Sequence, residues 1–231
     1  MKDRIVWGSL LLACWCSGAA GQAAAPDPGA TAANMPQEDS KPLPGILPIY
    51  HFSPTLRTYQ PLTPGEKFRI ATDDSLAPGT FVLAGLVAGE SQWTNENRSF
   101  GQGAAGFGRY FGAAYGDLFI GNYMREAIFP TLLHEDPRYF RRGTGSAWSR
   151  LRYAVGHTFW TQHDSGGMEF NFSEIAGTSA AVAISNAYYT DRRTAGDAAD
   201  KFGLQIGLDT AANVVYEFLP DLERKLRRYA K

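Results

Sequence analysis

The sequence has little cysteine and no excess of positive charge. Of its 231 residues only two are Cys, and 22 Lys and Arg residues stand against 23 Asp and Glu residues, for a formal net charge of −1. Two cysteines cannot build a disulfide scaffold, and a chain without cationic excess is not a general nucleic-acid binder. The motif Gly-x-Ser-x-Gly is also absent, which excludes the nucleophile elbow of an α/β-hydrolase.

Long hydrophobic runs are absent beyond the N-terminus. No later stretch reaches the ~18 uninterrupted apolar residues typical of a membrane-spanning helix. The longest apolar segment contains Arg125 and Glu126, and such charges are costly in hydrocarbon. These features favour a water-facing protein over a lipid-embedded bundle and leave peripheral contact with a membrane open.

The N-terminal segment is typical of an export signal. Lys2 and Arg4 precede an apolar stretch over 5–15, and small residues fill 17–21. This order predicts a signal peptide over 1–21 that is removed after Gly21. Both cysteines would leave with it, so the mature chain could not be a thiol enzyme.

A lipoprotein signal is the alternative interpretation of the same segment. Leu11-Leu12-Ala13-Cys14 resembles a lipobox, in which the cysteine becomes acylated. In either case we expect an exported protein, in the periplasm, at the periphery of the outer membrane or secreted.

Proline and alanine dominate the next segment. Nine of the 13 prolines lie before residue 66, and proline cannot donate a hydrogen bond to a helix or a sheet. This composition predicts a linker over 22–65, within which 46–70 could lie extended across the domain as an ordered strap. A helical domain is expected over 66–231.

The remaining chain predicts an all-α fold, a compact bundle of about five helices. Pro78 suits a first helical turn, Pro130 a kink or an end, and Ser146, Asn171 and Thr194 suit N-caps. The expected helices cover 78–92, 103–133, 146–162, 172–188 and 195–218, the last of them stopping before Pro220 and followed by a short charged helix over 221–229.

Small residues recur every four positions in these segments, as in a glycine zipper. Residues four apart share a helix face, and glycine in a helix costs ~1 kcal/mol relative to alanine unless a close contact offsets it. We therefore expect helices to pack through small-residue seams. The columns are Gly85 and Gly89; Ala104, Gly108, Gly112 and Gly116; Gly177, Ala181 and Ser185; and Ala199, Gly203, Gly207 and Ala211.

Several motifs resemble those of a group of exported bacterial proteins of uncharacterised function. They are the segment 101–115, which contains GFGRYFGAAY; the segment 129–140, FPTLLHEDPRYF; Ser149-Arg150-Leu151; and the segment 184–189, ISNAYY. The resemblance covers most of residues 66–218. It implies export and an all-helical domain, and it implies no activity and no catalytic residue.

Arginines gather around a glycine turn over 138–152, here called the arginine-rich turn. The free N–H groups at a helix start and the guanidinium groups together suit an anion such as a lipid headgroup phosphate. The same arginines could instead pair with the acids of the chain or cover apolar surface. The candidate anion-binding residues are Arg138, Arg141, Arg142, Gly143, Gly145, Ser146 and Arg150.

Histidines and acids form a second candidate site. His134, Asp136 and His157 could hold a zinc ion with an open position or handle phosphate, but the spacing contains no His-Glu-x-x-His, and the sequence predicts no metal and no cofactor. The favoured function is therefore a non-enzymatic protein of the cell envelope, whose partners would be membrane lipid headgroups or another envelope protein. A metal-assisted or phosphate-handling hydrolase using these three residues is the alternative.

Overall fold

Helices make up most of the part of the chain that the structure describes, as expected for an all-α fold. The computed structural model describes residues 52–53, 59–189, 191 and 193–229, all within the unit Ser40–Lys231. The predicted signal peptide and most of the predicted linker, including 46–51 of the expected strap, lie outside the described residues. The helices are α1 (Pro64–Ser75), α2 (Pro78–Thr94), α3 (Gly103–Asn122), α4 (Phe129–Leu133), α5 (Ala147–Gly156), α6 (Phe172–Tyr188) and α7 (Ala195–Tyr229), with a 3-10 turn η2 (Arg98–Phe100) and a π-helix η3 (Tyr123–Ile128).

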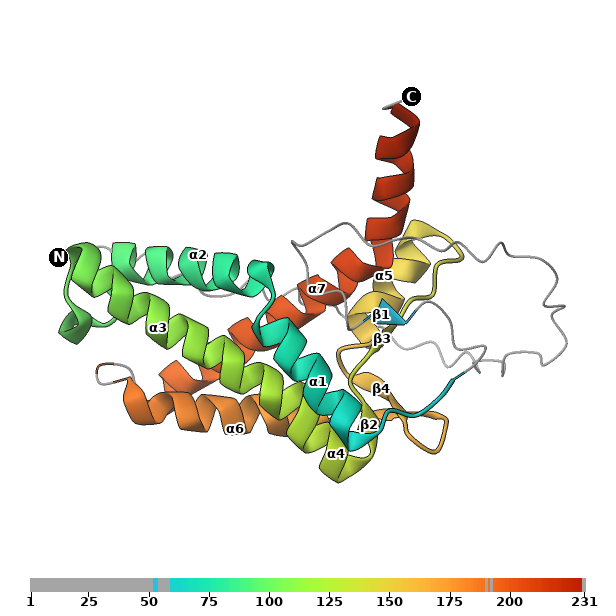
Figure 1. Cartoon of the computed structure of the whole chain (residues 1–231), viewed down its shortest axis with the longest axis horizontal. Helices are drawn as coiled ribbons and strands as arrows, with labels where there is room; N and C mark the ends of the chain where they lie inside the picture. Colours follow the sequence, from blue (N-terminus) through green and yellow to red (C-terminus); the bar gives the residue numbers. More distant parts are fainter. Residues whose placement is uncertain (1–51, 54–58, 190, 192, 230–231) are drawn as a thin grey trace, which may run out of the picture. The chain divides into compact units, whose positions relative to one another are not determined.

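Short strands join these helices. The strands are β1 (Phe52–Ser53), β2 (Glu135–Asp136), β3 (Tyr139–Phe140), β4 (Trp160–His163) and β5 (Met168–Phe170). Strand β1 pairs in parallel with β3, and β4 lies between β2 and β5 in an antiparallel sheet. In Figure 1, α2 and α6 flank α3, and α7 crosses the bundle toward α5.

Three predicted helices are confirmed. Helix α2 covers 78–94, α6 covers 172–188, and α3, η3 and α4 together form one continuous helical segment over 103–133. Asn171 caps α6 as its sequence position predicts, because its side chain accepts the N–H of Glu174.

The N-terminal boundary differs from the prediction. Residues 64–70 of the expected strap are helical, because α1 begins at Pro64, two residues before the expected start of the domain. Thr63 and Glu66 form a capping box, and Pro64 occupies the first turn, where its missing N–H costs nothing.

The third predicted helix is too long. Helix α5 ends at Gly156, and 160–163 form strand β4 rather than a helical turn. Thr158, Phe159, Trp160 and Thr161 are β-branched or aromatic residues, which favour extended structure.

The fifth predicted helix is too short, because α7 runs through Pro220 as far as Tyr229. Proline frees the carbonyl groups one turn before it and bends the helix, and Figure 1 shows α7 turning sharply along its C-terminal part. The carbonyl oxygen of Glu217 accepts hydrogen bonds from Arg141 Nε and Arg150 Nη2. These donors bind the backbone of α7 in the turn that precedes Pro220.

The π-helix η3 precedes the other helical proline, Pro130. The N–H of Phe129 donates to Met124 O, five residues back, in place of the α-helical bond. This wider turn accommodates the proline and brings Arg125 and Glu126 to the buried side.

The small-residue columns divide between the interior and the surface. In α6, Gly177, Ala181 and Ser185 are buried. The α7 column and the first three residues of the α3 column face outward, and a methyl group at Gly108 or Gly207 would meet no atom within 4 Å. The contact between α2 and α3 uses a different set, Ala84 and Ala88 against Tyr110 and Ala114.

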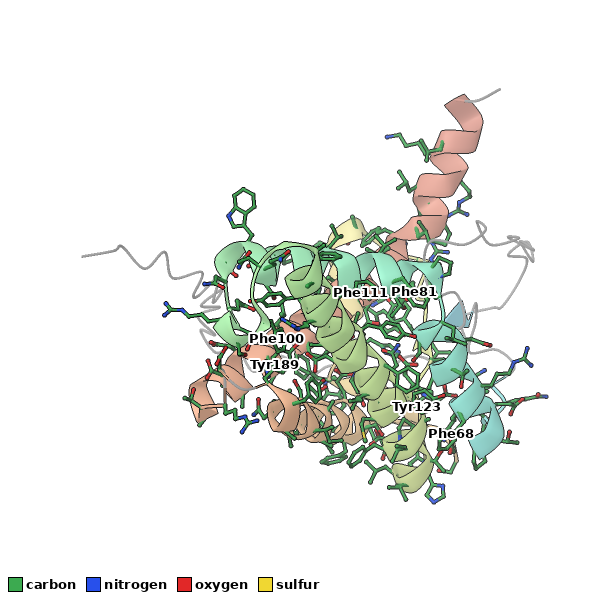
Figure 2. The ribbon with its side chains drawn as sticks, turned by 60° about the vertical axis from the view of Figure 1, so that its left-hand side comes forward. Phe68, Phe81, Phe100, Phe111, Tyr123 and Tyr189 are labelled. Atoms are coloured by element: carbon green, nitrogen blue, oxygen red, sulfur yellow. The ribbon has the colours of Figure 1, made fainter. Side chains whose placement is uncertain are left out.

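Aromatic rings form a ladder along α3 into η3. Rings four residues apart lie in contact from Phe107 to Tyr123, with centroids 4.7–6.5 Å apart. Phe81 of α2 stacks on Tyr115 of this ladder, and Figure 2 shows Tyr123 beside Phe68 of α1. The ladder therefore joins the three helices on the side of α3 away from α6.

Candidate functional site

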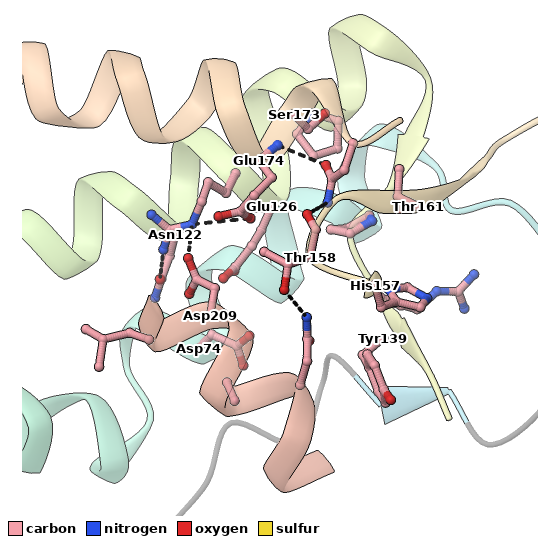
Figure 3. A pocket seen from close by; sticks show the side chains of 18 of the residues that line it. Asp74, Asn122, Glu126, Tyr139, His157, Thr158, Thr161, Ser173, Glu174 and Asp209 are labelled. Atoms are coloured by element: carbon pink, nitrogen blue, oxygen red, sulfur yellow. Dashed lines mark hydrogen bonds and ion pairs between the residues drawn. The ribbon is translucent and has the colours of Figure 1, made fainter. Parts of the chain in front are cut away.

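A cavity of about 220 Å³, with eight charged residues in its lining, lies where the helices meet the small sheet. Its walls come from α1, α2, α3, η3, α6 and α7, and from the segment that contains β2, β3, β4 and the end of α5. Figure 3 shows four acids and Asn122 on one side of the cavity and His157 and Tyr139 on the other. The charged lining residues are Asp74, Glu126, Glu135, Asp136, Glu174, Asp209, Arg125 and Arg138.

Arg125 is at the centre of the acidic side. Its Nε lies 3.3 Å from Asp209 Oδ2 and 4.0 Å from Glu174 Oε2, and its side chain is 6% exposed. Burial acts to lower its pKa, but the neighbouring Asp209, Glu174 and Glu126 raise it, so the guanidinium stays charged. Within the described residues, the buried Nη1 has no hydrogen-bond partner.

Glu174 is the acid most perturbed by this environment. Burial raises its pKa well above the ordinary value, and the nearby Asp209 raises it further through charge and a hydrogen bond. Burial beside a second carboxyl group therefore favours the protonated form of Glu174. Gln205 donates to both oxygens of Asp209, at 3.1 and 3.0 Å.

Two glycines provide the space that Arg125 occupies. A methyl group at Gly121 would lie 2.7 Å from Arg125 Nη1, and one at Gly177 would lie 3.1 Å from both the N and the Cα of Arg125. The π-helix, a glycine of α3 and a glycine of α6 therefore cooperate to place one guanidinium at the cavity wall.

Glu135 and Asp136 bind groups of the protein itself. The carboxylate of Glu135 accepts the N–H groups of Phe172 and Ser173, at 3.1 and 2.8 Å, and so caps the N-terminus of α6. Burial still raises its pKa despite these bonds. Asp136, of the predicted His/acid site, forms a bidentate pair with Arg138, with Nη2 and Oδ2 2.6 Å apart.

His157 lines the cavity within an aromatic group. Its ring lies 4.9 Å from that of Tyr139 and 5.6 Å from that of Tyr153. Burial lowers its pKa to about 4, so the imidazole is neutral near pH 7.

The structure does not bring the three residues of the predicted His/acid site together. Asp136 and His157 line the cavity, but His134 does not. It ends α4 in a left-handed conformation, is 71% exposed, and lies 4.0 Å from Asp164, which in turn pairs with the buried Lys67. Among the described residues, no group of three His, Cys, Asp or Glu side chains could hold a metal ion.

The arginine-rich turn surrounds two acids of α7. Glu217 accepts the N–H groups of Arg142 and Gly143, both at 2.9 Å, and Arg150 Nε, at 2.6 Å. Asp221 pairs with Arg141 and Arg150. Burial opposes ionisation, but these hydrogen bonds lower the pKa of Glu217 below its ordinary value.

The other members of the turn have local roles. Ser146 caps α5 by accepting the N–H of Ser149, and Gly143 and Gly145 have positive φ angles of 67° and 99°. Arg138 lies at the cavity, bound to Asp136. An external anion would therefore compete with carboxylates of the chain, and its binding at this turn stays a prediction.

Sequence reasoning did not assign Arg125, Glu174 and Asp209 to a site. Each is a charged residue on the inner side of a long apolar helix. Burying such a charge costs free energy, and this cost was the signal that the sequence contained. Their meeting could not be foreseen, because they lie on η3, α6 and α7, up to 84 residues apart.

Comparison with known proteins gives no assignment, since no protein-family model, curated protein or solved structure matches the chain. A search of the described helices for one long and apolar enough to span a bilayer found none.

Proposed function

We propose that this protein is an exported, non-enzymatic binding protein of the bacterial envelope whose cavity takes up a small polar solute. The cavity is the observation that carries the proposal. Its volume of about 220 Å³ is the volume that about seven molecules occupy in liquid water. This is smaller than the ~300 Å³ at which sites for drug-sized ligands begin.

The charged residues in the cavity lining support binding over a purely structural role. Removing charged groups from water is costly, and buried ion pairs are often replaceable by apolar residues without loss of stability. Here six carboxyl-bearing residues and two arginines line one hollow. A polar solute can pair with such groups.

A cavity-filling variant tests the proposal. Ala212 lines the cavity, whereas its neighbour Ala211 faces outward on the same helix. The thermal stability of the full chain would be measured against a panel of small neutral, anionic and cationic polar solutes, because a ligand of the folded state raises Tm. We expect at least one solute to stabilise the wild type and Ala211→Leu, and not Ala212→Leu.

Two results would contradict this proposal. One is that no solute of any charge class stabilises the wild-type chain. The other is that Ala212→Leu, folded with the same circular dichroism spectrum, responds to the solutes as Ala211→Leu does.

A hydrolase is the second candidate, because Asp136 and His157 line the same cavity. A neutral imidazole can accept a proton or bind a metal. Hydrolysis of phosphate and carboxylate esters would be measured with and without added zinc or manganese. An activity that is lost in His157→Phe and retained in His134→Asn would favour the enzyme.

The envelope location and its partners belong to the same proposal. The signal-like N-terminal segment supports export. Large apolar side chains on α5, β4 and the start of α6 face outward, with exposed fractions of 65% for Trp148, 51% for Trp160 and 56% for Phe172. Such side chains suit contact with lipid headgroups or with another envelope protein.

A further inference from the structure

The last part of α7, residues 221–229, is here called the C-terminal arm. Figure 2 shows this part of the helix standing apart from the other helices. Two of its leucines, Leu222 and Leu226, are 54% and 58% exposed. A surface helix usually turns its apolar side chains toward a core, and these leucines face solvent instead.

The arm has an apolar side and a basic side. Leu222 and Leu226 lie four residues apart and so share one face of the helix. Arg224 is two positions from each leucine and therefore lies on the opposite face, and Lys225 lies at its flank. Both basic residues are exposed. An apolar face opposite a basic face is the pattern of a helix that lies in a membrane interface.

The charge of the arm differs in sign from that of the chain. Residues 221–229 contain four Lys and Arg residues and two acids, in a chain of net charge −1. One of the two acids, Asp221, pairs with Arg141 and Arg150 of the folded body. Anionic lipids attract Lys and Arg side chains that lie close to the surface. The arm is therefore complementary in charge to an anionic lipid surface.

Contacts at the base of the arm connect it to the folded domain. Besides its pair with Asp221, Arg150 lies over the ring of Phe218, with its guanidinium carbon 4.5 Å from the ring centroid. Arg150 also donates to the carbonyl of Glu217. A helix that is already formed and held at its base loses less conformational freedom on binding than an unfolded tail does.

We infer that the C-terminal arm binds the surface of a membrane that contains anionic lipids, with Leu222 and Leu226 inserted below the headgroups and Arg224 and Lys225 beside the phosphates. This inference rests on the membrane contact in the proposed function and names the segment that makes it. An acidic protein surface would leave the leucines in water. Two arms packed along their leucines would bring like charges together.

Vesicle binding by the full chain tests the inference. The probes are vesicles of phosphatidylglycerol and phosphatidylcholine in equal parts, and vesicles of phosphatidylcholine alone. In co-sedimentation, the partition coefficient for the anionic vesicles should be higher by about tenfold or more at low salt. The difference should largely disappear at ~1 M salt, where the Debye length is only about 3 Å. Equal binding to the two kinds of vesicle at low salt would overturn the inference.

The leucines have a matched control. Leu222→Gln with Leu226→Gln should weaken binding to the anionic vesicles by about tenfold or more, because two apolar side chains no longer leave water. Val82→Gln with Leu86→Gln changes side chains of α2 that are 60% and 67% exposed, and it should leave binding unchanged. Equal effects of the two double variants would contradict a specific role of the arm.

The basic residues have a control of the same charge. Arg224→Gln with Lys225→Gln should weaken binding by about tenfold or more at low salt. Arg69→Gln with Arg98→Gln removes two charges from exposed positions of α1 and η2 and should have little effect. The circular dichroism spectrum and thermal melt of each variant separate a loss of binding from a loss of folding.

The failures of the two proposals are distinguishable. If Trp148→Gln with Trp160→Gln abolishes vesicle binding while the arm variants bind as the wild type does, the membrane contact of the proposed function stands and the arm inference is wrong. If the wild type binds neither kind of vesicle, both membrane contacts fail, and solute binding to Ala212→Leu still tests the cavity. If the leucine variant instead turns a dimer into a monomer in sedimentation equilibrium, and vesicle binding is unchanged, the arms pair with each other and the inference is wrong.

Discussion

At Gly177, helix α6 passes directly over the backbone of Arg125. A methyl group there would lie 3.0 Å from Arg125 Cγ and 3.1 Å from its N and Cα. Main-chain atoms of a packed π-helix cannot move aside as a flexible side-chain end can. This glycine was predicted as part of a seam, and the structure shows that its partner is one residue, the guanidinium-bearing residue at the cavity wall.

Gly177→Ala should therefore destabilise the protein. Overpacking costs about 1–3 kcal/mol, and the gain in helix propensity, about 1 kcal/mol, offsets it only in part. We expect a net loss of up to about 2 kcal/mol in urea unfolding. Gly207→Ala is the matched control, since its methyl group meets no atom within 4 Å, and it should be neutral or stabilising. Equal stabilities of the two variants would contradict the close approach of α6 to Arg125.

His157 makes a second prediction at the residue scale, about pH. Its pKa of about 4 in the folded protein lies below the ordinary value of about 6.5. As the pH falls from about 6.5 to 4, the unfolded chain binds a proton that the folded chain does not, so this group removes stability. The difference corresponds to about 3 kcal/mol at the acid end.

His157→Phe keeps a ring among Tyr139, Phe140 and Tyr153 and removes this titration. As the pH falls through the same window, the free energy of unfolding of the variant should rise relative to that of the wild type. Urea unfolding at several pH values measures this difference. The raised pKa values of Glu135 and Glu174 act in the opposite direction, but both proteins share them. His134→Asn, at an exposed position, should follow the wild type. A constant difference between His157→Phe and the wild type across the window would contradict a buried neutral imidazole.

At the scale of elements, the sequence predicted the structure where local chemistry decides it. Capping residues and prolines placed α2, α6 and the segment 103–133, because a cap or a missing N–H acts within one turn. Prediction failed where contacts between residues far apart in the sequence determine the structure. Helix α7 continues through Pro220, and arginines about 70 residues earlier bind the carbonyl of Glu217 in the turn before it. The cavity likewise exists only once η3, α6 and α7 meet.

Glu217→Gln tests the connection between α7 and the arginine-rich turn. The carboxylate is fully buried, and its replacement leaves Arg150 without a charged partner at that position, which costs about 3 kcal/mol or more. Because hydrogen bonds lower the pKa of Glu217 in the folded protein, its contribution is present above the pKa of the unfolded carboxyl, near 4.3, and is lost as the pH falls below it. The difference between wild type and variant in urea unfolding should therefore shrink at acid pH.

Glu90→Gln, on the outward face of α2, is the control and should change stability by no more than about 0.5 kcal/mol. A loss for Glu217→Gln as small as that of the control would mean that the turn holds α7 by other contacts. In that case its arginines would be available to an external anion, as the sequence analysis first predicted.

At the scale of the whole molecule, carboxylates of the chain bind the chain's own cationic side chains and helix N–H groups. Glu135 caps α6, Glu217 and Asp221 fill the arginine-rich turn, Asp136 binds Arg138, and Asp164 binds Lys67. The net charge of the chain is therefore near neutral, although its interior contains several contacts between charged groups. At the acidic side of the cavity, three acids lie around the single guanidinium of Arg125. That local imbalance is why we place ligand binding at the cavity and not at the arginine-rich turn.

Export belongs to the same scale, and the two cysteines offer a sharp test of it. Cleavage after Gly21 would remove Cys14 and Cys16 together, so the mature protein should contain no thiol and should show the intact mass of residues 22–231, in the soluble periplasmic or secreted fraction.

The lipoprotein alternative requires acylation of Cys14, because only that cysteine follows the lipobox-like Leu11-Leu12-Ala13. Cys14→Ser would then move the protein from the membrane fraction to the soluble fraction, and Cys16→Ser would not. If both variants fractionate as the wild type does, and the mass fits cleavage near Gly21, the cysteines have no part in anchoring and the mature protein meets the membrane only through its folded surface. Retention of both thiols in the recovered protein would contradict export by either route.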